Sequence, residues 1–360
     1  MTDRYDATAL TEFAARLFHH AGLEKDRAKI VAETLVEGDL LGQTTHGLAL
    51  LGPYLDEVVA GRIAKSGEPA VLAHTAVVQT WDGCRLPGPY LVRRASDWAS
   101  ETAKTFGIGA VAIRRSGHIG CLAAYVERIA QRRQLLLLTS SDPSTASVAP
   151  FGGTQRLITP NPVAAGWPTG GTPVVMDIST SITTNGMTAR LAKQGQRFPH
   201  ACLLDATGQP TADPAAFFTD PPGTLLPLGG VEAGHKGWAL GLLMEALTSG
   251  LAGHGRATEP SEWGAAVYLQ VLDPAHFGGV VGFEQEAGWL AGKVHANPPT
   301  DATRPPRLPG ERGLGSKEAQ LREGITLHPT IWPMFKARAA SAGLALPEPI
   351  NSPPKLRSGS

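Results

Sequence analysis

Apolar residues recur at every third or fourth position near the start of the chain, and this spacing predicts helices. One helix is expected over residues 7–21, with Asp6 placed to cap its first turn. The same spacing predicts a second helix over about 26–41 and a third from about 46 to 60. The beginning of the chain is therefore expected to form a helical unit.

Short apolar runs bounded by glycine, proline or aspartate follow, and they predict strands. The predicted strands cover 76–81, 109–113, 135–140, 173–178, 201–206 and 266–273. Further helices are predicted over 90–105, 121–133, 238–251, 316–323 and 329–343. The helix at 238–251 is so apolar that we expect it to be buried.

These elements predict a division of the chain into parts. Residues 1–75 and 312–345 are expected to form a helical domain, and residues 76–311 a mixed core of strands and helices. The segment 346–360 is rich in proline and polar residues, so it is expected to be a disordered tail.

Charge and cysteine content narrow the class of protein. Lys plus Arg and Asp plus Glu number 32 each, so no basic field exists to hold nucleic acid or an anionic membrane surface. Three cysteines lie far apart without a CxxC pair, which indicates neither a metal site nor a disulfide framework. The start of the chain lacks a signal-peptide pattern and no apolar run approaches a membrane span. A cytoplasmic enzyme acting on a small molecule fits this composition.

Two glycine-rich stretches resemble nucleotide-binding motifs only loosely. The stretch 107–112, GIGAVA, has the spacing of a dinucleotide fingerprint, but it follows a predicted helix and opens a predicted strand. The fingerprint requires the opposite order, so Gly107 is interpreted as a helix C-cap.

The second stretch, GGVEAGHKGWAL at 229–240, is a near miss to a phosphate-binding loop. His235 displaces the lysine to position 236, and Gly237 stands where serine or threonine should follow. Glycines, a lysine and a helix start can still bind an anion through backbone N–H groups. The alternative is a flexible turn with a solvated lysine.

Polar residues at the ends of apolar strands are candidates for chemistry. His118 follows one predicted strand and precedes a helix, and Ser140, Ser141 and Asp142 follow another. The alternative for Asp142 is an ordinary turn opener before Pro143.

His46 follows Thr45 at the expected start of the third helix. It is either a chemical group presented there or the first helical residue behind a threonine N-cap.

Several separated motifs occur in a fixed order from about residue 6 to residue 344. They are THGLALLGPY (45–54), GHIG (117–120), SSDPSTASVAPFGG (140–153), Asn161-Pro162, DISTS (177–181), HKGWALGLLMEAL (235–247) and Pro309-Gly310-Glu311. In these motifs the chain resembles the malate/L-lactate dehydrogenase family of the second type. That family includes ureidoglycolate and sulfolactate dehydrogenases, diketogulonate reductases and cyclic-ketimine reductases, and it is unrelated to the Rossmann lactate and malate dehydrogenases.

The resemblance implies an α/β fold of mixed α+β character, without a Rossmann domain. A mixed, largely antiparallel sheet with helices would be joined to a helical domain from both ends of the chain, in a homodimer. It also implies NAD or NADP as cofactor, bound with the substrate by residues 76–311. The implied reaction is hydride transfer to or from a C=O, or alternatively a cyclic C=N, next to a carboxylate.

The resemblance also assigns roles to residues by position. The acid/base group would be His46, His118 and Asp142, with Thr45 as the hydroxyl neighbour. Cofactor contacts would come from Ser141, Ser179, Ser181, His235, Lys236, Pro309, Gly310 and Glu311, and substrate contacts from Leu50, Tyr54 and Met187. Histidine suits the acid/base role because its pKa lies near operating pH, and a helix N-terminus at His46 would favour a neutral ring.

Two positions depart from the family pattern. Leu50 stands where the family has an arginine, and Met187 stands where it has a lysine. Either the substrate carboxylate is absent or masked, or another cation such as Arg114, Arg115 or Arg190 binds it. A catalytically silent member that binds a ligand is a further alternative, against which the retained His46 and His118 argue.

Overall fold

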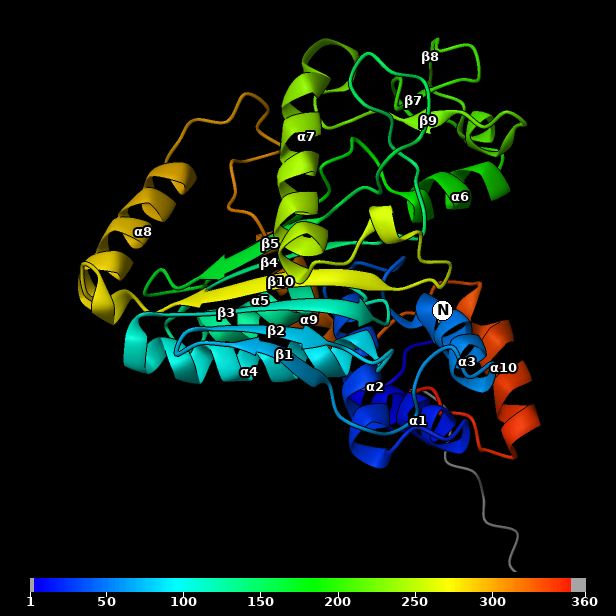
Figure 1. Ribbon diagram of the computed structural model, residues 1–360, viewed down its shortest axis with the longest axis horizontal. Coiled ribbons are helices and arrows are strands. Elements are labelled where there is room, and N and C mark those ends of the chain that lie inside the picture. Colours follow the sequence, from blue (N-terminus) through cyan, green and yellow to red (C-terminus); the bar gives the residue numbers. More distant parts are fainter. Residues whose placement is uncertain (1–2, 351–360) are drawn as a thin grey trace, which may run out of the picture. The chain divides into compact units, whose positions relative to one another are not determined.

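The computed structural model describes residues 3–350, and these fall into two compact units (Figure 1). The helical unit comprises the described residues up to Ser66 and those from Arg312 onward, and the sheet unit comprises Gly67–Glu311. Each unit has its own core. Within residues 3–350, no helix combines the length and the apolar character that a membrane span requires.

The helical unit is built on amphipathic helices, as the spacing predicts. Asp6 Oδ1 accepts a hydrogen bond from Ala9 N at 2.9 Å, so the predicted N-cap is confirmed. Phe13 is buried, and its ring lies 5.0 Å from that of Phe335. The helices of this unit are α1 (Ala7–His20), α2 (Lys25–Leu40), η1 (Leu48–Leu50), α3 (Leu51–Val59), α9 (Glu311–Glu323) and α10 (Ile331–Ala342).

The third predicted helix begins later than expected. Residues 44–47 form turns and bends, and the first helical residue is Leu48. The buried carboxylate of Asp39, on α2, accepts a hydrogen bond from Leu48 N at 2.6 Å and so satisfies this helix start. Thr45 is therefore not an N-cap, and His46 does not lie in a helix N-terminus; both interpretations were wrong.

The beginning of the predicted tail is bound within the helical unit. Ile350 N donates a hydrogen bond to Arg4 O at 2.8 Å, and Pro349 forms a bridge with Tyr5. These backbone contacts hold the chain up to residue 350, whereas residues 351–360 of the predicted disordered tail lie outside the described residues.

The sheet unit carries the mixed, largely antiparallel sheet that the resemblance implies, and that prediction is confirmed. Among the described residues, seven strands pair in the order β1-β2-β3-β10-β4-β5-β6, and only β2 and β3 run parallel. The strands are β1 (Ala70–His74), β2 (Val78–Asp82), β3 (Ile108–Ser116), β4 (Leu135–Ser141), β5 (Val163–Trp167), β6 (Val174–Ile178) and β10 (Ala265–Leu272).

Two neighbouring helices pack on this sheet: α4 (Gly88–Phe106), which lies beneath it in Figure 1, contacts β3, and α5 (Ala123–Ala130) contacts β5. Gly107 has a φ of 83° and ends α4, which confirms its interpretation as a C-cap rather than part of a fingerprint. The remaining elements are α6 (Asn185–Lys193), β7 (Leu203–Leu204), β8 (Pro210–Thr211), η2 (Pro214–Phe218), β9 (Thr224–Leu225), α7 (Gly230–Glu245), η3 (Ala246–Gly250), η4 (Arg256–Thr258), η5 (Pro274–His276) and α8 (Val280–His295).

The apolar helix predicted over 238–251 is not buried within this chain. It corresponds to the second half of α7 and the π-helical η3, and it begins eight residues earlier than predicted, at Gly230. Leu242 and Leu243 are 46% and 50% exposed, so the expectation of burial was wrong for the single chain. Burial in the core of the sheet unit therefore does not explain why this helix is so apolar.

Candidate active site

The sheet order brings two of the predicted site segments to one edge. Strands β3 and β4 both run antiparallel to β10, and β10 lies between them. Ala265 pairs with Ser116 at the end of β3, and Ala266 pairs with Ser141 at the end of β4. The segments that carry His118 and Asp142 therefore leave the sheet on either side of the start of β10.

The imidazole of His118 is held by an aromatic ring and by the backbone. It stacks on the indole of Trp263, with ring centroids 4.9 Å apart and an interplanar angle of 24°. Gly120 N donates a hydrogen bond to His118 Nδ1 at 3.2 Å. Because Nδ1 accepts, the neutral ring carries its proton on Nε2 and can donate from that nitrogen.

The loop around His118 is fixed at three further points. Gly117 N donates to Leu86 O at 3.0 Å, and the hydroxyl of Tyr125 donates to Ile119 O at 2.5 Å. Asp177 Oδ2 on β6 accepts from Ala123 N at 2.9 Å, at the beginning of α5. These contacts leave the loop little freedom to move the ring.

Asp177 is a titratable group that sequence reasoning gave no role of its own. Loss of solvent raises the pKa of its carboxyl group from the ordinary 3.8 to about 6, although N–H groups at the start of α5 stabilise the charged form. The same environment raises the pKa of the adjacent Cys121 thiol, first by burial and then by the charge of Asp177. The signal in the sequence was an aspartate inside an apolar strand, in PVVMDI.

Asp142 uses its carboxylate within its own turn. Oδ1 accepts hydrogen bonds from Ser144 N at 3.0 Å and from Ser144 Oγ at 2.7 Å, and Oδ2 accepts from Thr145 Oγ1 at 3.2 Å. These are the contacts of a turn opener, the alternative that the sequence left open for this residue. No hydrogen bond between Asp142 and His118 is among them.

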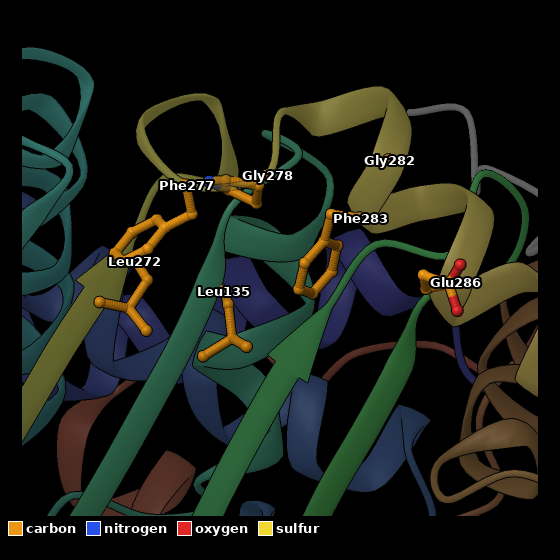
Figure 2. Close-up of a pocket in the computed structure, with 8 residues that line it drawn as sticks. Leu135, Leu272, Phe277, Gly278, Gly282, Phe283 and Glu286 are labelled. Atoms are coloured by element: carbon orange, nitrogen blue, oxygen red, sulfur yellow. The ribbon is translucent and has the colours of Figure 1, made fainter.

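A cavity of about 430 Å³ lies at the other end of the same strands (Figure 2). Leu135 begins β4 and Leu272 ends β10, and both line it, so it opens at the edge of the sheet opposite to His118. Phe277 and Phe283 complete an apolar lining, with Glu286 at one side. The cavity is therefore separate from the candidate active site.

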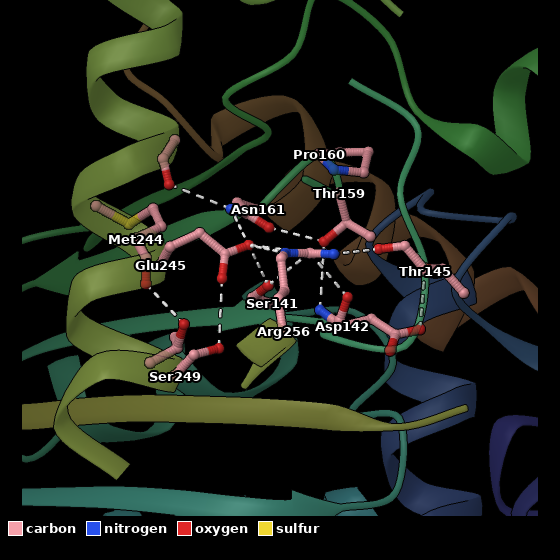
Figure 3. Close-up of polar contacts among 12 residues, drawn as sticks. Ser141, Asp142, Thr145, Thr159, Pro160, Asn161, Met244, Glu245, Ser249 and Arg256 are labelled. Carbon is pink, nitrogen blue, oxygen red and sulfur yellow. Dashed lines mark hydrogen bonds and ion pairs between the residues drawn. The ribbon is translucent and has the colours of Figure 1, made fainter. Parts of the chain in front are cut away.

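A buried polar network fixes the backbone of the Asp142 loop (Figure 3). Glu245, at the end of α7, pairs with Arg256 at 2.9 Å, and its Oε1 accepts from Ser141 Oγ at 2.7 Å and from Asn161 Nδ2 at 3.1 Å. Arg256 Nη2 donates to Asp142 O at 2.9 Å. Sequence reasoning named Ser141 but gave no role to Glu245, which lies within the HKGWALGLLMEAL motif, or to Arg256, because nothing local indicates that these two charges pair across 11 residues.

The proposed cofactor residues of two separate motifs are brought together. Leu228 N donates to Thr180 O at 2.9 Å and Ile182 N donates to Leu226 O at 2.9 Å, so the loop after β6 pairs with the segment that leads into α7. Ser181 is buried and its hydroxyl donates to Thr183 O, while Ser179 Oγ donates to Ser181 O. The two serines therefore stabilise this loop.

The start of α7 offers groups that fit an anion. Gly229 is in a left-handed conformation with a φ of 97° and precedes the helix, whose first N–H groups lack partners within it. His235 and Lys236 lie on the second turn and are exposed, and His235 contacts the ring of Phe151 edge-on at 5.6 Å. Backbone N–H groups with a nearby lysine suit a diphosphate such as that of a dinucleotide.

The last predicted cofactor segment is packed against the edge strand β6. Pro309 O accepts a hydrogen bond from Val175 N at 3.1 Å. Gly310 has a φ of 90°, and a Cβ there would lie 2.6 Å from Val175 O, so glycine is required. Glu311 Oε1 contacts His295 Nε2 at 2.5 Å and its Oε2 accepts from Leu308 N, which makes it a structural residue of this segment.

The helical unit carries the other predicted residues. Thr45 Oγ1 and His46 Nδ1 lie 2.9 Å apart, which is a hydrogen bond within the turn 44–47. Leu50 ends η1 and is half-buried, and Tyr54 is buried on α3. In the sheet unit, Met187 lies in the first turn of α6 and is 38% exposed.

Comparisons with known proteins agree with this fold. The chain is 30% identical over 347 residues to an L-lactate dehydrogenase from Cupriavidus necator, which covers 94% of this chain and 98% of that protein. Its structure is similar to that of malate dehydrogenase from Entamoeba histolytica, with a TM-score of 0.90 at 22% identity over 97% and 100% of the two chains, a likeness of fold. It is also similar to Δ1-piperideine-2-carboxylate reductase from Pseudomonas syringae, with a TM-score of 0.83 at 27% identity over 94% and 100%.

The fold and these relatives define the class: the protein is an oxidoreductase that acts on CH–OH groups and lacks a Rossmann domain. The chain belongs to the malate/L-lactate dehydrogenase family, whose model matches residues 5–336. The resemblance noted from the sequence is thereby confirmed. Dehydrogenases of this family generally use a nicotinamide cofactor.

Proposed function

We propose that the protein transfers a hydride between NAD(P)H and the carbonyl carbon of a 2-oxo acid or a derivative of one. The observation that carries this proposal is the ring of His118, which is stacked on Trp263 and whose Nδ1 accepts from Gly120 N, so that the neutral ring carries its proton on Nε2. When bound, the cofactor supplies the hydride. His118 then hydrogen-bonds the substrate oxygen through Nε2–H and stabilises the negative charge that develops there.

The proton that completes the new hydroxyl group is assigned to His46 by the resemblance. Because its Nδ1 accepts from Gly120 N, His118 can donate from Nε2, which suits polarisation of the substrate oxygen. His46, with Thr45 Oγ1 at 2.9 Å from its Nδ1, is the other retained histidine. His46→Ala is therefore expected to lower turnover by about 10²- to 10⁴-fold and to change cofactor affinity far less.

We infer that Lys236 and the first turn of α7 hold the cofactor's phosphate groups. The exposure of Lys236, the left-handed Gly229 and the helix start at Gly230 support this role. Lys236→Ala should raise the Kd for NADH and NADPH by about tenfold or more, since a charge-assisted contact is lost. An unchanged Kd in fluorescence titrations refutes the role, and Lys193→Ala, on α6, is the matched loss of a surface lysine.

We infer that the substrate has no free carboxylate at the position where the family's arginine, replaced here by Leu50, would bind one. The side chain of Leu50 has no group that could donate a hydrogen bond to a carboxylate, and an unpartnered buried carboxylate costs several kcal/mol. The alternative cations are engaged in part: Arg114 Nε and Arg115 Nε donate to Asp82 at 3.1 Å and 2.9 Å. An amide, an ester or a carrier-bound acid has no free carboxylate and so needs no cation to bind it.

The experiment is a screen of 2-oxo acids, their neutral derivatives and cyclic ketimines, read by NADH and NADPH absorbance. We expect kcat/KM to be higher for neutral derivatives in the wild type, and Leu50→Arg to gain activity on the acids. A wild type that reduces free acids at about 10⁴ M⁻¹s⁻¹ or above disproves the masked-carboxylate proposal. Turnover of any substrate excludes a silent ligand-binding protein.

Reduction of a cyclic ketimine is the second candidate. The similarity to Δ1-piperideine-2-carboxylate reductase, at 27% identity over 94% of this chain, favours it. A C=N carbon accepts hydride as a C=O carbon does, so the same screen decides between them.

We also propose a homodimer, in which the apolar surface of α7 and α8 is covered by a second copy. Leu242, Leu243, Trp289 and Leu290 are each 46–60% exposed, and none of the sixteen residues of α8, all within the described chain, is buried. A helix without buried residues gains little stabilisation from packing against its own chain. Light scattering that gives the mass of one chain at micromolar concentration would disprove the dimer.

A further inference from the structure

We propose that Trp263 is a positioning residue, which holds the imidazole of His118 in the orientation and tautomer that present Nε2–H. This inference rests on the proposed role of His118. Neither a motif of the family nor the sequence pattern assigned anything to Trp263, which lies two residues before β10. The observation that leads to it is the stack of the two rings at 4.9 Å and 24°.

Trp263 is suited to this task because its own backbone is fixed. Arg85 Nη2 donates a hydrogen bond to Trp263 O at 2.8 Å. At the next residue, a Cβ on Gly264 would lie 2.4 Å from Ser116 O, so the start of β10 is pressed against the end of β3. The indole is therefore anchored to the same strand end from which the His118 loop departs.

The arginine that supports Trp263 is held by an unusual turn. Cys84 and Arg85 have φ values of 51° and 60°, in the left-handed region that residues other than glycine rarely adopt. Arg85 N donates to Arg115 O at 2.9 Å, and Cys84 N donates to Asp82 Oδ1 at 2.9 Å. Backbone strain of this kind persists where the surroundings over-determine it, and here it orients Arg85 toward Trp263.

The stack and the Gly120 contact act on different degrees of freedom of the His118 ring. Stacking fixes the plane of the imidazole, and the N–H of Gly120 selects which nitrogen accepts within that plane. Without the indole, the stack no longer fixes the plane of the ring, and the contact between Nδ1 and Gly120 N is weakened. The consequence is a fall in kcat with little change in cofactor binding, because misorientation of a reacting group lowers the rate.

The test compares Trp263→Leu, which removes the stack, with Trp263→Phe, which keeps an aromatic face. We expect kcat to fall about 10- to 100-fold in the leucine variant and to recover to within about threefold in the phenylalanine variant. The Kd for NAD(P)H and the Tm should stay close to wild type in both. Equal kcat in the leucine variant and the wild type overturns the proposal, as does equal loss in both variants with unchanged Tm.

A second readout does not depend on turnover. In histidine-labelled protein, the 15N chemical shifts of His118, assigned by their disappearance in His118→Gln, report which nitrogen carries the proton. We expect the Nε2–H form in the wild type and in Trp263→Phe, and a mixture of tautomers in Trp263→Leu. The same tautomer in all three overturns the positioning role. If His118→Ala turns over normally while the shifts change as expected, the role of His118 in catalysis fails but the stack is upheld.

Discussion

The loops that follow β3 and β4 leave the same edge of one sheet, yet they are held in opposite ways. The loop after β3 fixes a side chain: His118 is stacked on Trp263 and accepts from Gly120 N, so the neutral ring carries its proton on Nε2. The loop after β4 fixes a backbone: Arg256 donates to Asp142 O, while the Asp142 carboxylate serves Ser144 and Thr145 in its own turn. The side chain of a polar residue after an apolar strand is thus held by another segment in one case and used within its own turn in the other.

The strongest test of this difference is to remove the side chains of His118 and Asp142 one at a time. His118→Ala should lower kcat by about 10²- to 10⁴-fold, because a catalytic hydrogen-bond donor is lost. Asp142→Ala should lower it less than tenfold, since its carboxylate binds only its own turn. Initial rates at saturating cofactor measure both, with Tm as the control for folding. Similar losses in the two variants would show that Asp142 takes part in the chemistry.

The next largest effect is expected from the network beneath the Asp142 loop. Glu245→Ala removes one acceptor from each of Arg256, Ser141 and Asn161, and leaves the charge of Arg256 without its carboxylate partner. The free energy of unfolding should fall by about 2–4 kcal/mol, because a largely buried charge is left unpaired.

Denaturant unfolding measures this loss, and Glu245→Gln, which keeps an acceptor oxygen, is the matched control. If the alanine variant is as stable as the wild type, the network does not hold the loop.

The smallest effect concerns Asp177, which anchors the other loop at the start of α5. Loss of solvation raises the pKa of its carboxyl group from 3.8 to about 6. Between these values the unfolded chain has released a proton that the folded protein keeps, so the contribution of Asp177 to stability falls as pH rises from about 4 to about 6. It stays low at higher pH, where the folded carboxyl group is ionised.

Asp177→Asn cannot ionise, and its side-chain oxygen can still accept from Ala123 N. Its stability relative to the wild type should therefore increase by about 1–3 kcal/mol between about pH 4 and about pH 7. Unfolding midpoints at the two pH values give this difference. A constant difference between the two proteins would mean that the carboxyl group titrates normally.

Local spacing along the sequence was sufficient to predict the elements with a strong periodic signal and to locate the motifs on them. Amphipathic α1, its Asp6 cap, the apolar strands β3, β4 and β10 and the C-cap at Gly107 could all be predicted, because local spacing and backbone preferences decide them. Strand β1 and helix α8 were not predicted. Neither contains a buried residue, so neither shows the periodic spacing of apolar positions that marks a buried face. The family motifs likewise named His118 without any knowledge of its surroundings.

Tertiary structure alone decided what surrounds each of those residues. The carboxylate of Asp39 accepts from Leu48 N, nine residues later, at the start of the helix that follows His46. The indole of Trp263 stacks on His118, which lies 145 residues earlier in the chain. Glu245 and Arg256 join at the end of β4 because α7 and η4 meet there. Such contacts depend on strand order, and strand order follows from how whole elements bury their apolar faces together. Local sequence therefore identified the candidate histidine, and packing between distant segments fixed its orientation.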